Sequence, residues 1–317
     1  RLLIIGWCLL SQQRETISFL CQIQPHFFEK GINLNGIAFI VLCLFVTPAM
    51  GWWGSGHVVL SKAATLALPE EMPAFFREGG DVIAAASIDA DLHKNRSVPN
   101  TYKTESPEHF IDLEMLEGAP LPALRYEFIE LCWELDVDPT RIGLGPYAVA
   151  EWTGRLAVAF AEHRKWPENE AIRAKCLLYA GFVSHYAQDL MQPLHTTIHY
   201  NGIKRDDGTV VGKGIHDNVD SAVERLEMRP ESLAKDHELA VHDSLIAGII
   251  EQLNASHARV SAVYEVGEKW DDVTDEGMRT LSFERARASV QFNASLFLTA
   301  WRKSDGMWLP SWLDRSR

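Results

Sequence analysis

Two pairs of histidine and aspartate with the same spacing carry the clearest chemical signal in the sequence. His185 is followed four residues later by Asp189, and His216 is followed four residues later by Asp220. Side chains four residues apart lie on one face of a helix, so each pair can direct an imidazole and a carboxylate at one metal ion. Either pair taken alone is also compatible with a surface ion pair or a capping interaction.

A further histidine follows the first pair closely. The segment after Asp189 contains Gln192-Pro-Leu-His195, and the proline turns the chain, so that His195 can face the same ion. His199, four residues further on, competes with His195 as a ligand and is otherwise an ordinary loop histidine.

Residues nearer the N-terminus extend this set of potential ligands. His57 follows Trp52-Trp-Gly-Ser-Gly, and a Trp52 freed by processing could chelate a metal through its α-amine and carbonyl oxygen. The alternative is that Trp52 anchors the N-terminus in the core. His109 precedes a phenylalanine, with Asp89 and Asp91 upstream, and such a lone histidine is otherwise a packing residue.

Helices must position these residues. Apolar side chains recur at helical spacing through most of the chain after residue 51, whereas alternating strand patterns are scarce. Polar segments 95–107 and 200–214 are predicted as long loops, the second with a small hairpin at Val210 and Val211. The sequence therefore predicts one all-α domain over 52–317. Its expected helices cover 57–68, 72–78, 81–88, 123–135, 146–163, 168–190, 215–226, 237–253 and 283–301.

The first 51 residues differ from the rest. Residues 37–46 are ten consecutive apolar residues, and Ala49 and Gly51 form a small-x-small pattern after them. The run is too short to cross a bilayer as a helix but fits the core of a signal peptide. We therefore predict that 1–51 is leader and signal peptide, removed before Trp52. The protein would then be secreted or periplasmic, without a stable membrane span. An N-terminal anchor is the alternative.

The charge balance restricts the partners that the chain can bind. The sequence has 317 residues, of which 47% are hydrophobic, and a formal net charge of −13. Such an acidic chain does not bind long duplex nucleic acid through basic side chains alone, so phosphate chemistry would require metal ions. Cys132 and Cys176 are the cysteines after residue 51, which allows at most one disulfide there and offers no thiolate zinc spacing.

In their order and spacing these residues resemble the trinuclear-zinc phosphoesterases. This superfamily comprises the single-strand-specific zinc nucleases (the nuclease S-one/P-one family) and the bacterial zinc-dependent phospholipases C. Short stretches such as LALPEEMPAFF, HFIDLE, QPLHTTIHYNG and KGIHDNVD are similar to a bacterial branch of it. The resemblance covers most of the chain after residue 51. The matching pattern is Trp52-x4-His57, Asp91, His109-Phe-Ile-Asp, His185-x3-Asp189-x5-His195 and His216-x3-Asp220.

The resemblance implies a multi-helix fold of the phospholipase C and zinc nuclease type that holds three Zn²⁺ ions. The implied ligands divide into three sets. One ion would be held by Asp91, His109, His185 and Asp189, a second by His195, His216 and Asp220, and a third by the amine and carbonyl of Trp52, by His57 and by Asp189 as a bridging carboxylate.

The resemblance also implies roles in catalysis and substrate binding. Asp91 would orient or deprotonate the attacking water, with Asp89 as the alternative, and Asp91 is preferred for its spacing from His109 and Lys94. Lys94 would assist transition-state charge, although it offers a point charge where a planar arginine is expected. Phe110 and Asp112 match positions that stack on a base and hydrogen-bond its edge in the nucleases, and both types recur in the phospholipases.

Three functions follow as alternatives. The first is hydrolysis of single-stranded DNA or RNA to 5′-phosphorylated products, without a nucleotide cofactor; Phe110, Tyr186 and Tyr200 could act as stacking platforms or be core residues. The second, in the same site, is hydrolysis of phospholipid headgroups, which would require an apolar rim. The third is an exported, non-catalytic helical protein with one structural metal or none. The four-cysteine framework of the fungal nucleases is absent, and no Glu-x-x-His pair supports a di-iron bundle.

Overall fold

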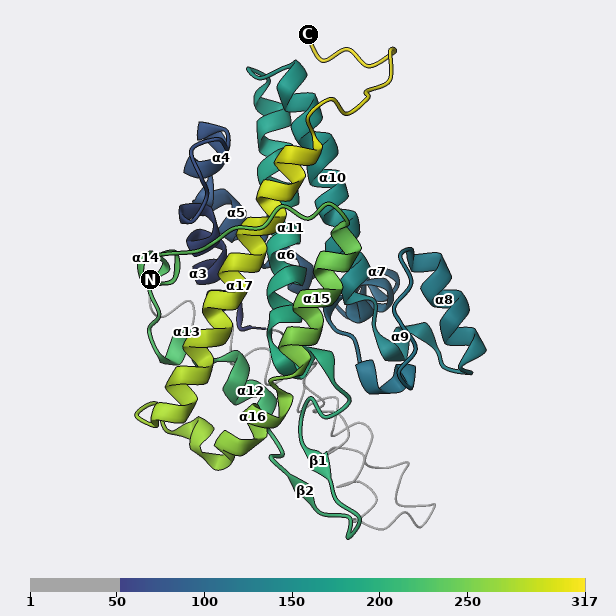
Figure 1. Cartoon of the computed structure of the whole chain (residues 1–317), viewed down its shortest axis with the longest axis vertical. Helices are drawn as coiled ribbons and strands as arrows, with labels where there is room; N and C mark the ends of the chain where they lie inside the picture. The colour runs from purple at the N-terminus through teal and green to yellow at the C-terminus, as the bar shows by residue number, and fades with distance from the viewer. Residues whose placement is uncertain (1–51, 317) are drawn as a thin grey trace, which may run out of the picture. The chain divides into compact units, whose positions relative to one another are not determined.

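Helices form nearly all the regular structure in residues 52–316, the part of the chain that the computed structural model describes (Figure 1). Strands β1 (Ile203–Lys204) and β2 (Val210–Val211) pair antiparallel, with Ile203 opposite Val211, as the expected hairpin. The all-α prediction is confirmed. The predicted leader and signal peptide, residues 1–51, lies outside the described residues, which belong to the compact unit Ala49–Arg317.

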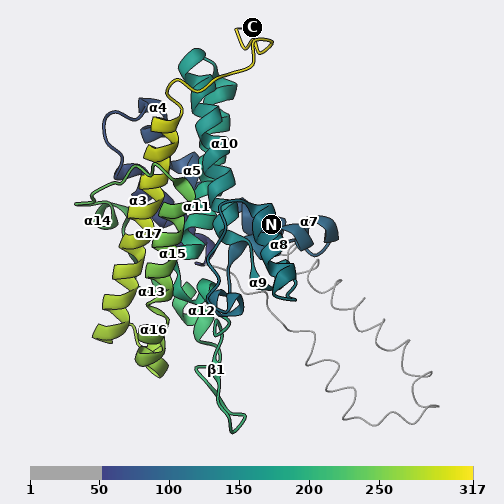
Figure 2. The same cartoon turned by 45° about the vertical axis from the view of Figure 1, so that its right-hand side comes forward.

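Three long helices form the centre of this unit (Figures 1 and 2). They are α10 (Gly145–Lys165), α11 (Glu170–Met191) and α17 (Glu276–Lys303), and each packs against the other two. Helix α11 begins where the Asn169 side chain accepts a hydrogen bond from the Ile172 amide at 3.2 Å. It ends just before Pro193, because proline disfavours a helical conformation in the preceding residue, Gln192, whose ψ is 115°.

A second group of helices covers α11 and α17. Helix α3 (Gly54–Leu66) packs against both, and α5 (Gly80–Ala86) packs against α3 and α11, with α4 (Ala74–Glu78) beside them. The buried Phe76 ring on α4 lies edge-on to Phe160 at 4.9 Å and to Phe297 at 5.3 Å between centroids. Such aromatic packing joins this group of helices to α10 and α17 in one hydrophobic core.

Short elements connect the long helices and carry much of the candidate site. Several were expected as loops, including the segment 95–107, which contains helix α7. Their bounds are α6 (Asp89–His93), α7 (Pro99–Glu105), η2 (Ser106–His109), η3 (Leu113–Leu116), α8 (Arg125–Glu134), α9 (Pro139–Ile142), η4 (Pro193–Thr196), α12 (Ile215–Asp220), α13 (Ala222–Arg225), α14 (Pro230–Leu233), α15 (Leu245–His257), α16 (Val260–Val266) and η5 (Gly267–Asp271).

Two of the predicted helices are wrong in part. The helix expected over 237–253 begins at Leu245, because the amides of Ala240 and His242 donate instead to Ser295 Oγ and Thr299 Oγ1 of α17, each at 3.1 Å. The side chains of α17 thus replace the helical carbonyls as acceptors. The helix expected over 215–226 is interrupted at Ser221 and forms α12 and α13.

Within residues 52–316, none of the helices combines the length and apolar character that a membrane span requires. Cys132 and Cys176 are buried free thiols that do not form a disulfide with each other.

Candidate metal centre

The first histidine–aspartate pair lies on the C-terminal half of α11, which is buried. His185 Nε2 lies 3.3 Å from Asp189 Oδ2, the contact that their spacing on a helix predicts. His185 Nδ1 donates to the main-chain oxygen of Ser87 at 2.7 Å. Since Nδ1 carries the proton of the neutral ring, Nε2 presents a lone pair to Asp189 and its neighbours.

Close contact between α5 and α11 makes this arrangement possible. A Cβ atom on Gly181 would lie 2.4 Å from the Cβ of Ala86, so only glycine permits the helices to approach to this distance. Gly181 lies one turn before His185, and Ala86 immediately precedes Ser87. The missing side chain therefore brings the Ser87 carbonyl within hydrogen-bonding distance of His185.

Asp91 and His109 complete the first group around His185. His109 Nδ1 lies 2.9 Å from His185 Nε2 and 2.9 Å from Asp189 Oδ2. Asp91 Oδ1 lies 3.8 Å from His185 Nε2 and 3.9 Å from His109 Nδ1. Of the two candidate aspartates, the structure therefore places Asp91, and not Asp89, with these histidines.

His57 forms a second group with His185 and Asp189. Its ring stacks on His185 with centroids 4.2 Å apart, and its Nε2 lies 3.4 Å from Asp189 Oδ1. The Trp52 side chain is buried, and its indole N–H donates to the main-chain oxygen of Gln188 at 3.0 Å. The next amide, that of Trp53, donates to the Asp220 carbonyl at 3.2 Å. The Trp52 segment is thus held beside the candidate metal centre. The Trp52 side chain is also buried in the core, as the alternative interpretation of this residue expected.

His195, His216 and Asp220 form the third group. His216 Nε2 lies 3.1 Å from both His195 Nε2 and Asp220 Oδ2. His195 Nδ1 donates to the His109 carbonyl at 2.8 Å, so its Nε2 also presents a lone pair. The Gln192 amide donates to Asp220 Oδ1 at 2.5 Å.

Burial favours the neutral, metal-ligating form of His57, His195 and His216, whereas the Asp189 and Asp91 carboxylates raise the pKa of His185 in spite of its burial. Burial, reinforced by the positive charge of His195 when protonated, holds the pKa of His216 well below its usual range. Burial and repulsion by His185 likewise lower the pKa of His57. Neutral imidazoles keep the lone pair that a cation would accept.

The carboxylates are buried, and burial opposes their ionisation unless a positive charge lies close by. Burial raises the pKa of Asp220 well above its usual value, against a single opposing hydrogen bond from Gln192. Burial also opposes ionisation of Asp189 and Asp91, but neighbouring His185, aided at Asp91 by Lys94, lowers both pKa values. Buried carboxylates of this kind are paired or coordinate metals.

The three groups fit divalent metal ions. Within each, one donor atom per residue lies within 4.8 Å of the others. Tetrahedral zinc with bonds of 2.0–2.1 Å places its donor atoms about 3.4 Å apart. The described separations bracket that value, and the buried His57 Nε2 and Asp189 Oδ1 have no hydrogen-bond partner. These buried histidine and aspartate groups could therefore hold metal ions. They are His57, His185 and Asp189; Asp91, His109 and His185; and His195, His216 and Asp220.

The other predicted site residues lie next to these groups. Lys94 Nζ is 2.6 Å from Asp91 Oδ1, and its side chain is only 5% exposed. The backbone is extended at Phe110, and the next residue lies beside His195, whose carbonyl accepts from the Ile111 amide at 2.9 Å. Burial and the nearby Glu114 carboxylate raise the pKa of Asp112 to about 7.

Gly143 fixes the position of Phe110. Its φ is +97°, and a Cβ there would lie 2.2 Å from the Phe110 carbonyl oxygen, so both the backbone and the space require glycine. The same carbonyl accepts from the Gly145 amide at 3.1 Å. The extended segment is thereby held against the start of α10.

Sequence reasoning missed several residues that support the site. Glu105 Oε1 lies 3.4 Å from His109 Nε2, and the Tyr186 hydroxyl donates to Glu105. The position of Glu105, four residues before His109, is the only feature of the sequence that indicates this contact. The side chains of Gln188 and Gln192 were also missed, although both lie inside the segment that carries the ligands.

His199, the competing candidate, is in none of the three groups found among residues 52–316. Its carbonyl instead accepts from the Tyr264 hydroxyl, and its amide donates to Thr197 Oγ1 at 3.1 Å. His199 therefore shapes the loop after η4.

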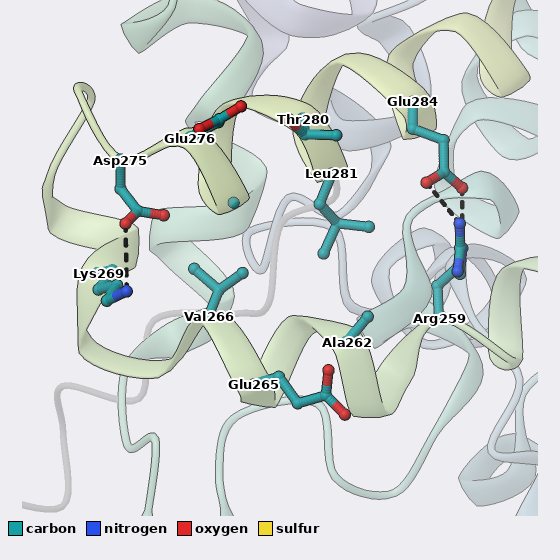
Figure 3. Close-up of a pocket in the computed structure, with 11 residues that line it drawn as sticks. Arg259, Ala262, Glu265, Val266, Lys269, Asp275, Glu276, Thr280, Leu281 and Glu284 are labelled. Carbon is teal, nitrogen blue, oxygen red and sulfur yellow. Dashed lines mark hydrogen bonds and ion pairs between the residues drawn. The ribbon is translucent and has the colours of Figure 1, made fainter.

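A separate surface pocket of about 630 Å³ lies between α16, η5 and the first turns of α17 (Figure 3). Both of its basic side chains are paired: Arg259 Nε donates to Glu284 at 2.8 Å, and Lys269 lies 3.4 Å from Asp275. No predicted site residue lines it. The pocket is therefore distinct from the candidate metal centre.

No protein-family model matches the chain, and a search of curated proteins finds no significant match.

Proposed function

We propose that the chain is a metal-dependent phosphodiesterase that binds three zinc ions. The observation that carries this proposal is the adjacency of the three histidine–aspartate groups. Two of them share His185, and Asp189 contacts histidines of all three, since Oδ1 also lies 3.9 Å from His195 Nδ1. A single structural metal would not need this set of eight side chains. Together with the resemblance to the trinuclear-zinc phosphoesterases, it favours a catalytic centre.

The chemistry divides between the ions and the chain. When bound, the dications would lower the pKa of water and stabilise charge on phosphoryl oxygens. Asp91 Oδ2 is buried without a hydrogen-bond partner, so it can orient an attacking water and accept its proton. Lys94, held on Asp91 Oδ1, supplies an ammonium group close to the position where negative charge would develop.

Single-stranded DNA or RNA is the proposed substrate. Phe110, partly exposed beside His109, would stack on a base, and Asp112 would hydrogen-bond the base edge. A carboxyl whose pKa is about 7 can donate as well as accept such a bond near neutral pH. We also propose that the protein is secreted or periplasmic after cleavage before Trp52.

Phospholipid headgroups are the second candidate substrate. The observation that favours them is apolar exposure beside the site. Leu92, next to Asp91, is 63% exposed, and Ile198, three residues after His195, is 43% exposed. Such side chains could form the apolar rim that a lipid substrate requires.

Metal analysis combined with three turnover assays tests the function. The full coding sequence is expressed, the first residue of the purified protein is determined, and zinc is counted. Single-stranded DNA, single-stranded RNA and phosphatidylcholine are then offered side by side. Three zinc ions with release of 5′-phosphorylated nucleotides are expected. Turnover of lipid alone would support the phospholipase, and one zinc ion or none without hydrolysis would support the non-catalytic protein.

Matched substitutions tie the activity to the site. His185→Ala removes the Nε2 donor that faces His109 and Asp189 and should abolish turnover. His163→Ala is the control, because His163 is also buried but packs against Phe75, with ring centroids 4.5 Å apart, and belongs to none of the groups. Equal activity of the two variants would contradict the assignment.

A further inference from the structure

Gln188 contacts two of the three residues to which the resemblance assigns the third ion, Trp52 and His57. Its main-chain oxygen accepts from the Trp52 indole at 3.0 Å, and its side-chain Oε1 lies 2.7 Å from His57 Nδ1. It also immediately precedes Asp189, the carboxylate that faces His57 Nε2. Gln188 is completely buried, so these contacts are not exchanged with solvent.

The amide group of Gln188 has a defined orientation. Its Nε2 donates to Ser61 Oγ on α3 at 3.0 Å and to Asn293 Oδ1 on α17 at 3.1 Å. With the Asn293 Oδ1 turned toward Gln188, as the structure places it, the Gln188 amide directs Oε1 at His57, where it accepts from Nδ1–H.

This orientation determines which nitrogen of His57 is available. Because Nδ1 carries the proton, Nε2 holds the lone pair, and Nε2 is the buried atom without a partner 3.4 Å from Asp189 Oδ1. An outer partner that fixes the tautomer and orientation of a ligating histidine contributes to metal affinity. The main-chain carbonyls of Ser87 and His109 fix the tautomers of His185 and His195 in the same way, by accepting from their Nδ1–H groups.

We propose that Gln188 is the positioning residue of the His57 site, which is the group of His57, His185 and Asp189. Helices α3 and α17 hold its amide, and the amide holds His57 in the tautomer that directs Nε2 at Asp189. This inference rests on the proposed function, because it assumes that the His57 site binds one of the zinc ions.

Gln188→Leu tests the role most directly. Leucine has a similar volume but leaves His57 Nδ1 without an acceptor. Loss of such an outer partner reduces metal affinity by about 10- to 100-fold, and we expect this loss for one zinc ion, with the other two unchanged. Gln188→Glu is the conservative variant. Its carboxylate can accept from His57, from the Ser61 hydroxyl and from the Asn293 amide after a flip, so the affinity should be retained.

Ser184→Ala is the matched control. Ser184 lies one turn earlier on α11, is equally buried, and its hydroxyl has no partner, so its removal should leave all three affinities unchanged. If Gln188→Leu does not fold, Gln188→Asn replaces it. Asparagine keeps an amide, but its side chain is shorter by one methylene and the amide no longer reaches His57. We expect the same reduction in affinity for one zinc ion.

The full coding sequence of each variant is expressed and the processed protein is purified. Zinc is counted and its affinities are measured by competition with a chelator, and ¹⁵N imidazole signals report the tautomer of His57. Wild-type protein should show an Nδ1-protonated His57, which Gln188→Leu should lose. Three zinc ions in the wild type with unchanged affinities and tautomer in Gln188→Leu would overturn this inference alone. A wild-type protein that binds no zinc would overturn the proposed function and this inference with it.

Discussion

Zinc should stabilise the folded protein in proportion to the number of complete donor groups. The two oxygens of Asp189 face two of the groups, since Oδ1 lies 3.4 Å from His57 Nε2 and Oδ2 lies 2.9 Å from His109 Nδ1, whereas His216 belongs to the third group alone. Asp189→Ala therefore leaves one group intact and His216→Ala leaves two. Each variant is compared with itself before and after zinc addition, so the destabilisation caused by the substitution cancels.

The magnitude follows from mass action. An ion at 100 times its dissociation constant stabilises the native state by about 2.7 kcal/mol per site. The wild type should gain about 8 kcal/mol, His216→Ala about 5 kcal/mol and Asp189→Ala about 3 kcal/mol. For a domain of this size, 1 kcal/mol shifts the unfolding midpoint by about 2–4 °C, so the wild-type midpoint should rise by roughly 15–30 °C.

Thermal unfolding followed by circular dichroism measures these shifts, first in chelator and then in excess zinc. His163→Ala, buried outside the groups, should shift as much as the wild type. A wild-type shift of less than about 3 °C, below what even one site would give, would refute the metal centre. Equal shifts in Asp189→Ala and His216→Ala would refute the bridging of two groups by Asp189.

Three further predictions concern the neighbours of these groups. Lys94→Met should lower kcat by about 100-fold and leave the zinc content unchanged, because the substitution removes the ammonium group beside Asp91 that would stabilise negative charge. A steady-state assay that gives a kcat within threefold of the wild type would contradict this role of Lys94. Asp112 keeps its proton to about pH 7 in the native state but only to about pH 4 when unfolded, so its contribution to stability is lost as the pH rises through 7. As the pH rises from 5 to 8, the free energy of unfolding of the wild type should therefore fall by about 1–2 kcal/mol relative to that of Asp112→Asn, after allowance for partial exposure of the side chain. Urea titrations measure this difference, and a difference that stays constant over this range would contradict the raised pKa. Gly181→Val should lower the free energy of unfolding by about 1–3 kcal/mol or more, because its side chain would overlap with α5. Gly154→Ala is the control and should not destabilise the protein, because the space around Gly154 is open. Similar urea midpoints for the two variants would contradict the packing argument.

Local spacing predicted much of the helical fold and the first contacts of the site. The pair His185 and Asp189 meets as expected because four residues span one helical turn, and the pair His216 and Asp220 does so on a helix of six residues. The end of α11 before Pro193 follows from the chemistry of proline alone.

The missing parts depend on contacts between distant segments. The start of α15 could not be placed because the acceptors for Ala240 and His242 lie more than fifty residues away on α17. The function of Gln188 was invisible for the same reason, since its partners His57 and Asn293 are separated from it by more than a hundred residues each. A glutamine inside an apolar helix carries no local mark of what it will contact.

The supports of the histidines differ in their sensitivity to mutation. Carbonyl groups of the main chain hold His185 and His195, and every residue type supplies a carbonyl, so no exchange of side chain at Ser87 or His109 can delete them. His57 depends on a side chain, which one codon change removes. Substitutions that accumulate in this sequence would consequently disrupt the group of His57 before the groups whose histidines are held by main-chain carbonyls.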